Sequence, residues 1–320
     1  MTTRALVTGG SGFVAQWAIK AMLERGWHVT GATHGAPPAG EVLAASECDA
    51  VAWLPADVTR QDELTTLVDT ARADVILHLA ALSHVPDAAR NPAYAYEVNT
   101  VGTVRLLAEV RRHRAAGTGD PLVLVVGSAE QYGRHDTDAM PIHEGAEQRP
   151  LTQYAASKVA QEVAAMQAHR SDGVRVICTR SFSHSGVGQA AQFLLPSLVM
   201  RALALPAAGG VLQIGNGETV RDFLHVRDVV EGYLSLCATG AEGEAYNVSS
   251  AEGVSVRALA HRVLHRLGRT ADVASADAHS RPVDVPMQVG NNDKLCRATG
   301  WSPRRTRDDI IDDLIHAATR

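Results

Sequence analysis

The chain has 320 residues, 46% of them hydrophobic, and a formal net charge of −5 at pH 7. That length supports one large or two modest domains, and a negative charge without a long basic run argues against a nucleic-acid-binding surface and against electrostatic membrane binding. No apolar segment approaches the length of a bilayer span, and the N-terminus lacks the pattern of a signal peptide. The four cysteines are scattered, which fits a cytoplasmic location, and the 14 histidines show no metal-ligand spacing.

Short apolar runs alternate with longer helical patterns through the first half of the chain. Strands are expected at residues 4–8, 28–33, 50–55, 74–79, 122–126 and 174–179, and helices at 13–25, 60–71, 93–114 and 152–171. The run 123–126 is apolar throughout, as in a strand buried on both faces. This alternation predicts the α/β class, with a Rossmann-type doubly wound parallel sheet covered by helices on both faces.

The rhythm changes after residue 182. A Gly/Ser-rich loop at 183–188 precedes a helix, then a strand at 211–214, a helix to about 238, a sheet strand at 245–248 and helices near 255–267 and 308–318. We therefore expect a dinucleotide-binding domain from 1–182 plus about 222–249, and a smaller, discontinuous α/β substrate domain from 183–221 and 250–320. Ligands of open α/β sheets bind beyond the carboxyl ends of the strands, so the cleft between the two parts is the expected site.

Residues 5–15 combine a strand, a tight glycine turn and a helix N-terminus. Gly9, Gly12 and Ala15 occupy the small-residue positions of a G-x-x-G-x-x-A spacing. Such a turn lets backbone N–H groups approach a pyrophosphate, and the helix dipole favours negative charge there. Glycine turns also precede helices for purely local reasons, so the spacing alone is a weak signal.

Tyr154 and Lys158 stand four residues apart, which places both on one face of a helix. A free phenol is a poor acid at neutral pH, and a cation beside it favours the phenolate and lowers its pKa. Tyrosine then exchanges a proton with a sugar or alcohol oxygen while a hydride moves at the attached carbon. The alternative is a solvated pair on an exposed helix.

Two polar residues follow the strand 122–126. Ser128 lies where a sheet enzyme displays side chains into its cleft, and its hydroxyl can donate to the oxygen that Tyr154 protonates. Glu130 can act as general acid or base in a dehydration. A simple reduction needs no such group, and Glu130 is then a loop residue that hydrogen-bonds a sugar hydroxyl.

Together these stretches resemble the extended short-chain dehydrogenase/reductase family. The resemblance covers nearly the whole chain and is carried by T-G-G-S-G-F-V-A at 8–15, D-V at 57–58, H-L-A-A at 78–81, Asn99, G-S-A-E-Q-Y-G at 127–133, Y-A-A-S-K at 154–158 and R-D-F at 221–223. It implies that the protein binds NAD or NADP and acts on a nucleotide sugar. It also implies that Asp57 and Val58 flank the adenine, that Leu79 to Ala81 line the cofactor, and that Asn99 supports the active-site helix. The remaining residues assigned to the cofactor are Gly9, Gly12, Phe13, Val14, Thr33, His34, Tyr154, Lys158 and Ser181.

Within the family, the GDP-mannose branch is most similar, first its 4-keto-6-deoxymannose reductases and then its 4,6-dehydratases. The segments 180–189, 215–223, 281–286, 290–295 and 299–301 carry this likeness. It implies that Arg221 and Arg281 hold the nucleotide diphosphate, because guanidinium groups bind phosphate oxygens in a fork. Substrate contacts are also expected from Ser83, Ser183 and His184. Ser183 departs from the asparagine usual at its position, which leaves the identity of the substrate open.

The end of the second strand decides the choice of cofactor. NAD enzymes often carry an acid there and NADP enzymes an arginine, whereas this chain has neither. Thr33 and His34 could both contact a phosphate and no carboxylate repels one, so the sequence favours NADP(H) over NAD(H).

Several functions remain open. The first is an NADPH-dependent reductase of the 4-keto group of a GDP-4-keto-6-deoxyhexose, and the second is a nucleotide-hexose 4,6-dehydratase assisted by Glu130. A C4 epimerase or decarboxylase follows. A non-catalytic dinucleotide sensor is less favoured, because such proteins usually lose the tyrosine or the lysine. The resemblance also implies a homodimer that pairs through the helices 93–114 and 152–171.

Overall fold

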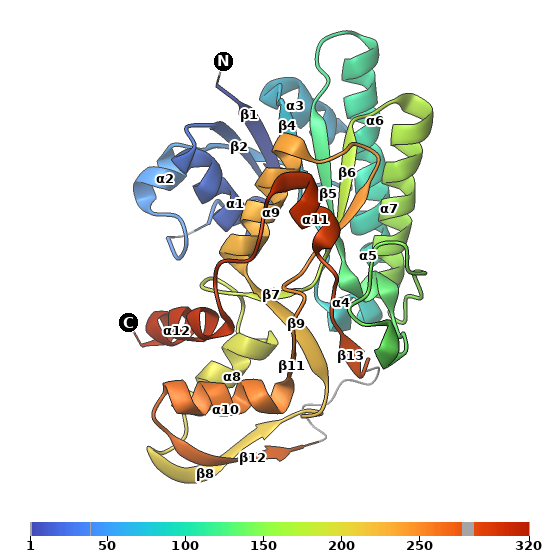
Figure 1. The fold of residues 1–320 in the computed structure, drawn as a ribbon. Coiled ribbons are helices and arrows are strands. Elements are labelled where there is room, and N and C mark those ends of the chain that lie inside the picture. Colours follow the sequence, from blue (N-terminus) through green and yellow to red (C-terminus); the bar gives the residue numbers. More distant parts are fainter. Residues whose placement is uncertain (1, 39, 277–284, 320) are drawn as a thin grey trace.

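A seven-stranded parallel sheet forms the centre of the molecule. The computed structural model describes residues 2–38, 40–276 and 285–319. The strands are β1 (Arg4–Thr8), β2 (His28–Thr33), β3 (Ala52–Pro55), β4 (Val75–His78), β5 (Leu122–Ser128), β6 (Val176–Ser181) and β10 (Ala245–Val248). They run in the order β10-β6-β5-β4-β1-β2-β3 (Figure 1). The predicted doubly wound α/β fold is confirmed, and the strand order reverses between β1 and β4, where such sheets bind their ligands.

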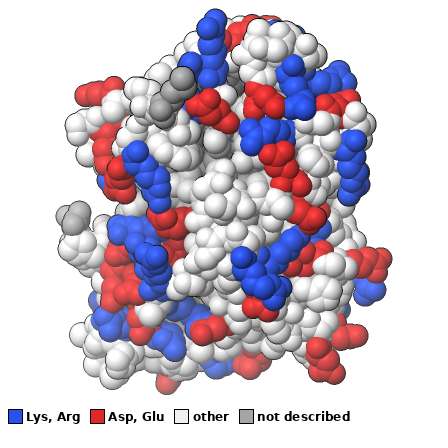
Figure 2. All heavy atoms as spheres, turned by 45° about the horizontal axis from the view of Figure 1, so that its top comes forward, with Lys and Arg blue, Asp and Glu red and all other residues white. Residues whose placement is uncertain are grey.

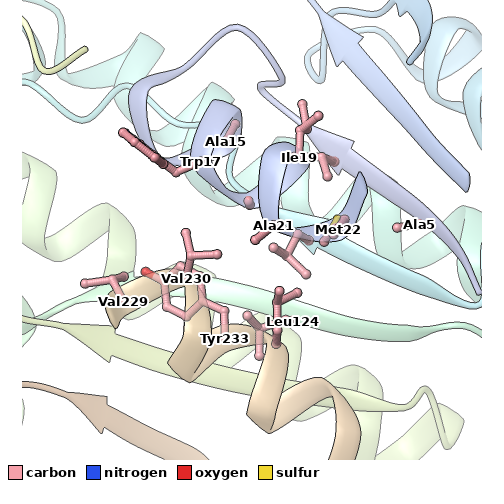
Figure 3. Packing of buried hydrophobic residues seen from close by; sticks show 14 of the residues in the cluster. Ala5, Ala15, Trp17, Ile19, Ala21, Met22, Leu124, Val229, Val230 and Tyr233 are labelled. Atoms are coloured by element: carbon pink, nitrogen blue, oxygen red, sulfur yellow. The ribbon is translucent and has the colours of Figure 1, made fainter. Parts of the chain in front are cut away.

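Helices cover both faces of this sheet (Figure 1). One face carries α1 (Phe13–Glu24), α9 (Val226–Thr239) and α11 (Asp293–Thr299), and the other carries α3 (Gln61–Ala71), α6 (Gly102–Ala115) and α7 (Gln153–Asp172). Successive strand residues alternate between the two hydrophobic clusters, as Val7 and Leu6 of β1 do. In Figure 3, Trp17 and Met22 of α1 lie across from Val230 and Tyr233 of α9, so α9, although far along the chain, completes the core under the first strands.

The expected helix 93–114 contains a wider turn. The structure has α5 (Pro92–Tyr96), a π-helical segment Glu97–Val101 and then α6. Asn99 lies in the π segment and is fully buried. A π turn inside an α-helix often marks a functional position, and here it directs Asn99 toward the loop after β4.

The smaller part has two sheets and its own core. One sheet joins β11 (Gly253–Ser255), β9 (Val220–His225) and β13 (Met287–Gln288), with β7 (Ser183–Ser185) also paired to β9; the other joins β8 (Ala208–Ile214) and β12 (Thr270–Ser275). The helices α8 (Leu194–Leu203), α10 (Val256–Arg266) and α12 (Arg307–Ala318) pack around a separate apolar cluster. Residues 183–188, expected to be a loop, therefore begin with a strand, and β9, β11, β12, β13 and α11 were not expected.

Short helices occupy several connections. They are α2 (Ala45–Asp49) and α4 (Val85–Arg90), with 3₁₀ turns at Ala129–Tyr132 and Thr137–Ala139. Among the described residues, every helix is too short or too polar to span a bilayer. Lysine and arginine are interspersed with aspartate and glutamate over the face in Figure 2.

Candidate active site

A cavity of about 1500 Å³ opens at the carboxyl ends of β1, β4, β5 and β6 and extends to β9 and β13 of the smaller part. It lies where the sheet topology predicts a ligand site. The expected residues that line it are Gly9, Gly12, Phe13, Val14, Leu79, Ala80, Ala81, Ser83, Ser128, Glu130, Tyr154, Lys158, Ser181, Ser183, His184 and Arg221. The structure therefore brings most of the sequence-predicted site together in one crevice.

The glycine turn after β1 leaves backbone exposed to this cavity. Gly9 has a φ of +67°, and a Cβ there would lie 2.9 Å from the backbone N and Cα of Ala80. Gly12 begins α1 as its N-cap, and a Cβ there would lie 3.0 Å from the Gly9 carbonyl oxygen. Only residues without a Cβ fit this close approach. The turn and the helix N-terminus behind it fit the diphosphate of a dinucleotide.

A buried hydrogen-bond chain supports the turn from below. The two ring nitrogens of His78 contact the hydroxyls of Thr8 and Thr103, each at 2.8 Å. The Thr103 hydroxyl donates to the Asn99 carbonyl, so it accepts from His78 Nε2 and from Gln161 Nε2. His78 is therefore the Nε2–H tautomer, and its Nδ1 accepts from Thr8, whose oxygen accepts in turn from the backbone N–H groups that follow β4. Burial lowers the pKa of His78 to about 3, so the ring is neutral.

Ser128 and Tyr154 meet across the cavity wall. Ser128 ends β5, and its Oγ accepts from the backbone N–H of Glu130 at 3.2 Å. Tyr154 lies in the first turn of α7, which Thr152 caps by accepting from the N–H of Ala155. The Tyr154 phenol lies close enough to the Ser128 side chain for that hydroxyl to lower its pKa. Two hydroxyls so placed can address one substrate oxygen.

The protein alone does not lower the pKa of Tyr154, so that expectation was wrong. The pKa of the phenol is raised to about 12, mainly by burial; the nearby Ser128 hydroxyl opposes this rise, and the negative charge of Glu130 adds to it. Lys158 does not act as expected because burial lowers its own pKa to about 7. The Lys158 amine is then only partly protonated at neutral pH.

Lys158 is buried along its stem, yet it lines the cavity. Within the described residues, no group hydrogen-bonds its Nζ. A buried ammonium without a protein partner is costly unless a ligand supplies one. This unpaired donor and the glycine turn fit a dinucleotide with ribose hydroxyls at Lys158 and phosphates at Gly9 to Phe13.

Asn99 supports the active-site helix, as predicted, from behind the cavity wall. Its Oδ1 accepts from the backbone N–H of Leu82 at 2.8 Å, and its Nδ2 donates to the Ser157 hydroxyl at 2.9 Å. It therefore joins the loop after β4 to α7 between Tyr154 and Lys158. Asn99 is not among the cavity-lining residues, so it positions the site without facing a ligand.

Some residues expected at the adenosine end of the cofactor lie outside this cavity. Thr33, His34, Asp57 and Val58 do not line the cavity. The Thr33 hydroxyl is buried and donates to the Gly35 carbonyl at 2.7 Å, which leaves it poorly placed for a phosphate. A carboxylate is also present, contrary to expectation, because Asp57 Oδ2 lies 3.2 Å from His34 Nε2.

The smaller part contributes Arg221 and His184 to the lining of the cavity. Arg221 of β9 lines the cavity, and its Nη1 donates to the carbonyls of Val220 and Val285 at 2.8 and 2.7 Å. His184 Nδ1 lies 2.9 Å from the Phe182 carbonyl, and its ring stacks near Phe13. These contacts hold Arg221 and His184 in place. Arg281 lies outside the described residues.

The side chains of Ser181 and Asp222 make hydrogen bonds to other groups of the protein. The Ser181 hydroxyl is engaged with the hydroxyl of Tyr233 at 2.6 Å. Asp222 is fully buried and accepts from the backbone N–H groups of Ser250, Ala251 and Gly290. Burial raises the pKa of Asp222 to about 6, against these hydrogen bonds. Sequence reasoning missed this anchor, although Asp222 stands in the R-D-F stretch.

No cluster of three metal-ligating side chains occurs in the part of the chain that the structure describes. A nucleotide cradle and a Tyr–Lys pair face one another on a doubly wound sheet, and this combination defines an extended short-chain dehydrogenase/reductase that acts on nucleotide sugars. More closely, the chain belongs to the GDP-mannose 4,6 dehydratase family, whose model matches residues 6–314. NAD(P) is the cofactor typical of this family.

Individual relatives agree with this membership. The chain is 33% identical over 236 residues to GDP-6-deoxy-D-mannose reductase of Pseudomonas aeruginosa, covering 73% of this chain and 76% of that protein. It is 29% identical to GDP-6-deoxy-D-talose 4-dehydrogenase of Aggregatibacter actinomycetemcomitans, covering 95% and 93%. RMD from Pseudomonas aeruginosa, solved in complex with NADPH, superposes with a TM-score of 0.80 at 28% identity, covering 99% and 97%. A UDP-glucose 4-epimerase of Thermotoga maritima, with a TM-score of 0.87 at 20% identity over 98% of both chains, shows the fold alone.

Proposed function

We propose that the protein reduces the 4-keto group of a GDP-4-keto-6-deoxyhexose with NADPH. The juxtaposition of Ser128 and Tyr154 in the lining of the cavity carries this proposal. The likeness to GDP-6-deoxy-D-mannose reductase supports the substrate class. Purified protein given NADPH and GDP-4-keto-6-deoxymannose should consume NADPH at 340 nm and form a GDP-6-deoxyhexose, and no consumption would refute the proposal.

In this proposal, residues of the protein supply the proton that the reduction requires. NADPH, when bound, supplies a hydride to the carbonyl carbon. Tyr154 donates its phenolic proton to the carbonyl oxygen, Ser128 donates a hydrogen bond to the same oxygen, and a proton from solvent then restores the phenol. Lys158 stabilises the resulting phenolate when it is protonated. The C=O bond thus gains one hydride and one proton and becomes an alcohol.

NADPH is proposed over NADH on one likeness, that to a structure solved with NADPH. His34 is exposed beside Asp57 and can turn to a 2′-phosphate, whereas Asp57 would repel it. Desolvation raises the pKa of Asp57, but the hydrogen bonds from Thr59 and the charges of His34 and Arg60 together outweigh it, so the pKa is lowered and the carboxylate stays charged. The choice of cofactor is tested by the ratio of kcat/KM with NADPH to kcat/KM with NADH. A ratio above one supports NADPH.

A 4,6-dehydratase is the second candidate, because Glu130 lines the cavity close enough for its charge to raise the pKa of Tyr154. A carboxylate there can remove the proton beside a ketone or protonate a leaving hydroxyl. Incubation with GDP-mannose and no added reductant separates the two functions. Formation of a 4-keto product that Glu130→Gln abolishes would support the dehydratase.

The division into domains is part of this proposal. We propose that residues 1–182 with about 226–249 bind the dinucleotide, and that 183–225 with 250–320 bind the nucleotide sugar. Two observations support this division. β10 is a strand of the large sheet and α9 packs against that sheet, whereas the smaller part has a separate core. Since β9 pairs in the small sheet, we place the return of the chain near residue 226 rather than 222.

A homodimer through α6 and α7 is also proposed. The two helices lie side by side (Figure 1), and they expose Val104 by 47% and Val163 by 62%. Exposed apolar side chains on adjacent helices favour a protein contact. Light scattering after gel filtration should give twice the mass of one chain, and Val163→Asp should halve it.

A further inference from the structure

Gln288 lies where the smaller part meets the catalytic loop. It belongs to β13, is 5% exposed and lines the cavity. In the parallel pairing of β13 with β9, Gln288 is the register partner of Arg221. Register partners on neighbouring strands project from the same face of a sheet, so Gln288 stands beside Arg221. Its amide also reaches the loop that follows Ser128.

The two ends of the Gln288 amide have different surroundings. Nε2 donates to the backbone carbonyl of Ala129 at 2.9 Å. Because a carbonyl only accepts, this contact fixes which end of the amide faces the loop. No described group donates to the other end, Oε1, and that atom is not sealed from solvent. Oε1 is therefore an acceptor without a described donor, on a side chain that lines the cavity.

The position of Gln288 matches one part of a nucleotide sugar. Ala129 stands between Ser128 and Glu130, and Arg221 is the residue proposed to hold the diphosphate. The hexose of such a substrate carries the diphosphate at C1 and the reacting carbonyl at C4, so its ring spans the space between these two groups. We propose that Gln288 Oε1 accepts a hydrogen bond from a hexose hydroxyl, so that Gln288 determines which sugar is bound. This inference rests on the function proposed above.

Binding separates this role from a general structural one. Kd is measured calorimetrically for GDP-mannose and for GDP, with NADP⁺ bound, in the wild type, in Gln288→Met and in Gln213→Met. Methionine keeps the length of the side chain but lacks both polar ends. Gln213 is an exposed glutamine of β8 and serves as the matched control. Loss of one neutral hydrogen bond predicts an affinity for GDP-mannose about tenfold lower in Gln288→Met, with GDP binding unchanged.

A deoxy-sugar series identifies the hydroxyl. Among GDP-mannose analogues that each lack one hydroxyl, one should bind the wild type about tenfold more weakly than GDP-mannose does. The same analogue should bind Gln288→Met as tightly as GDP-mannose binds that variant. Gln288→Asn, whose amide is one methylene shorter, is the second variant if the methionine variant fails to bind NADP⁺.

Each outcome decides. Unchanged GDP-mannose affinity in Gln288→Met, or equal losses for GDP and GDP-mannose, overturns the role of Gln288 and leaves the proposed function standing. A wild type that binds GDP-mannose no better than GDP also overturns this role. A wild type that binds neither overturns the proposed function as well.

Discussion

Arg180 donates to both carboxylate oxygens of Glu162, from Nε at 3.0 Å and from Nη2 at 2.6 Å, and both side chains are buried. Glu162 also accepts from Gln131 Nε2 at 2.8 Å, and Gln131 Oε1 accepts from the backbone N–H of Ser128 at 2.8 Å. The hydrogen bonds and charge of Arg180 lower the pKa of Glu162 against the desolvation that burial imposes. The ion pair thereby fixes the orientation of the Gln131 amide and, through it, the position of Ser128.

Glu162→Gln should destabilise the fold strongly. It leaves the Arg180 guanidinium buried without a counter-charge, which costs about 3–5 kcal/mol. Urea unfolding measures the loss. The control is Glu242→Gln, which breaks the exposed pair with Arg175, where side chains are 40% and 36% exposed, and should cost under about 1 kcal/mol. Similar losses of unfolding free energy in the two variants would show that the buried ion pair stabilises the fold no more than the exposed one.

The parallel sheet could be predicted because its strands obey a local rule. β1, β2 and β10 begin and end at the predicted residues, and most residues of each are buried in the sheet. β12, with the pattern T-A-D-V-A-S, is mostly exposed and has no such run. β13 has two residues, β7 consists of three polar residues, and β9 mixes apolar and polar residues without alternation. Their pairing depends on tertiary contacts that no local pattern records.

The candidate site divides in the same way. Gly9, Tyr154 and Lys158 stand in short motifs whose spacing alone brings them to one turn or one helix face. Gln288 meets Ala129 across 159 residues of sequence, and Arg180 meets Glu162 from a different element. Burial could not be anticipated either: it reverses the expected shift in the pKa of Tyr154. Partners far apart in sequence and the desolvation of a pocket are properties of the folded chain.

Tyr154→Phe should abolish turnover and preserve cofactor binding. Phenylalanine keeps the ring but removes the proton that reaches the carbonyl oxygen, and general acid catalysis contributes about 10²–10⁴-fold. Steady-state kinetics with the keto sugar measures kcat, and fluorescence titration measures the Kd for NADPH. A kcat within a factor of three of the wild type would remove Tyr154 from the mechanism.

His78 makes stability depend on pH in the acid range. Its folded pKa of about 3 lies below the ordinary value of 6.5, so the unfolded chain binds a proton between these values and the folded protein does not. The stabilisation is therefore complete above pH 6.5 and is lost as the pH falls toward 3, on the order of 5 kcal/mol in all.

The unfolding free energy from urea titrations between pH 7 and 4 tests this dependence on His78. His78→Gln cannot titrate, so it should be less stable at pH 7 and show a shallower slope with pH. His261→Gln, at an exposed position of α10, is the control and should keep the wild-type slope. Parallel slopes for the wild type and His78→Gln would contradict a neutral buried ring.

Lys158→Met should stabilise the protein while destroying its activity. The folded pKa of Lys158, about 7, lies below its ordinary 10.5 because burial disfavours the ammonium. The unfolded chain therefore holds the extra proton between pH 7 and 10.5, and wild-type stability rises with pH across this window. Methionine fills similar volume without that cost, so the unfolding free energy at pH 7–8 should increase by about 1–3 kcal/mol. Lys294→Met is the control; its half-exposed ammonium pairs with Glu244 at 2.7 Å, and its loss should leave stability equal or lower. If Lys158→Met unfolds at a lower urea concentration than the wild type, burial of the Lys158 ammonium does not cost the folded protein stability.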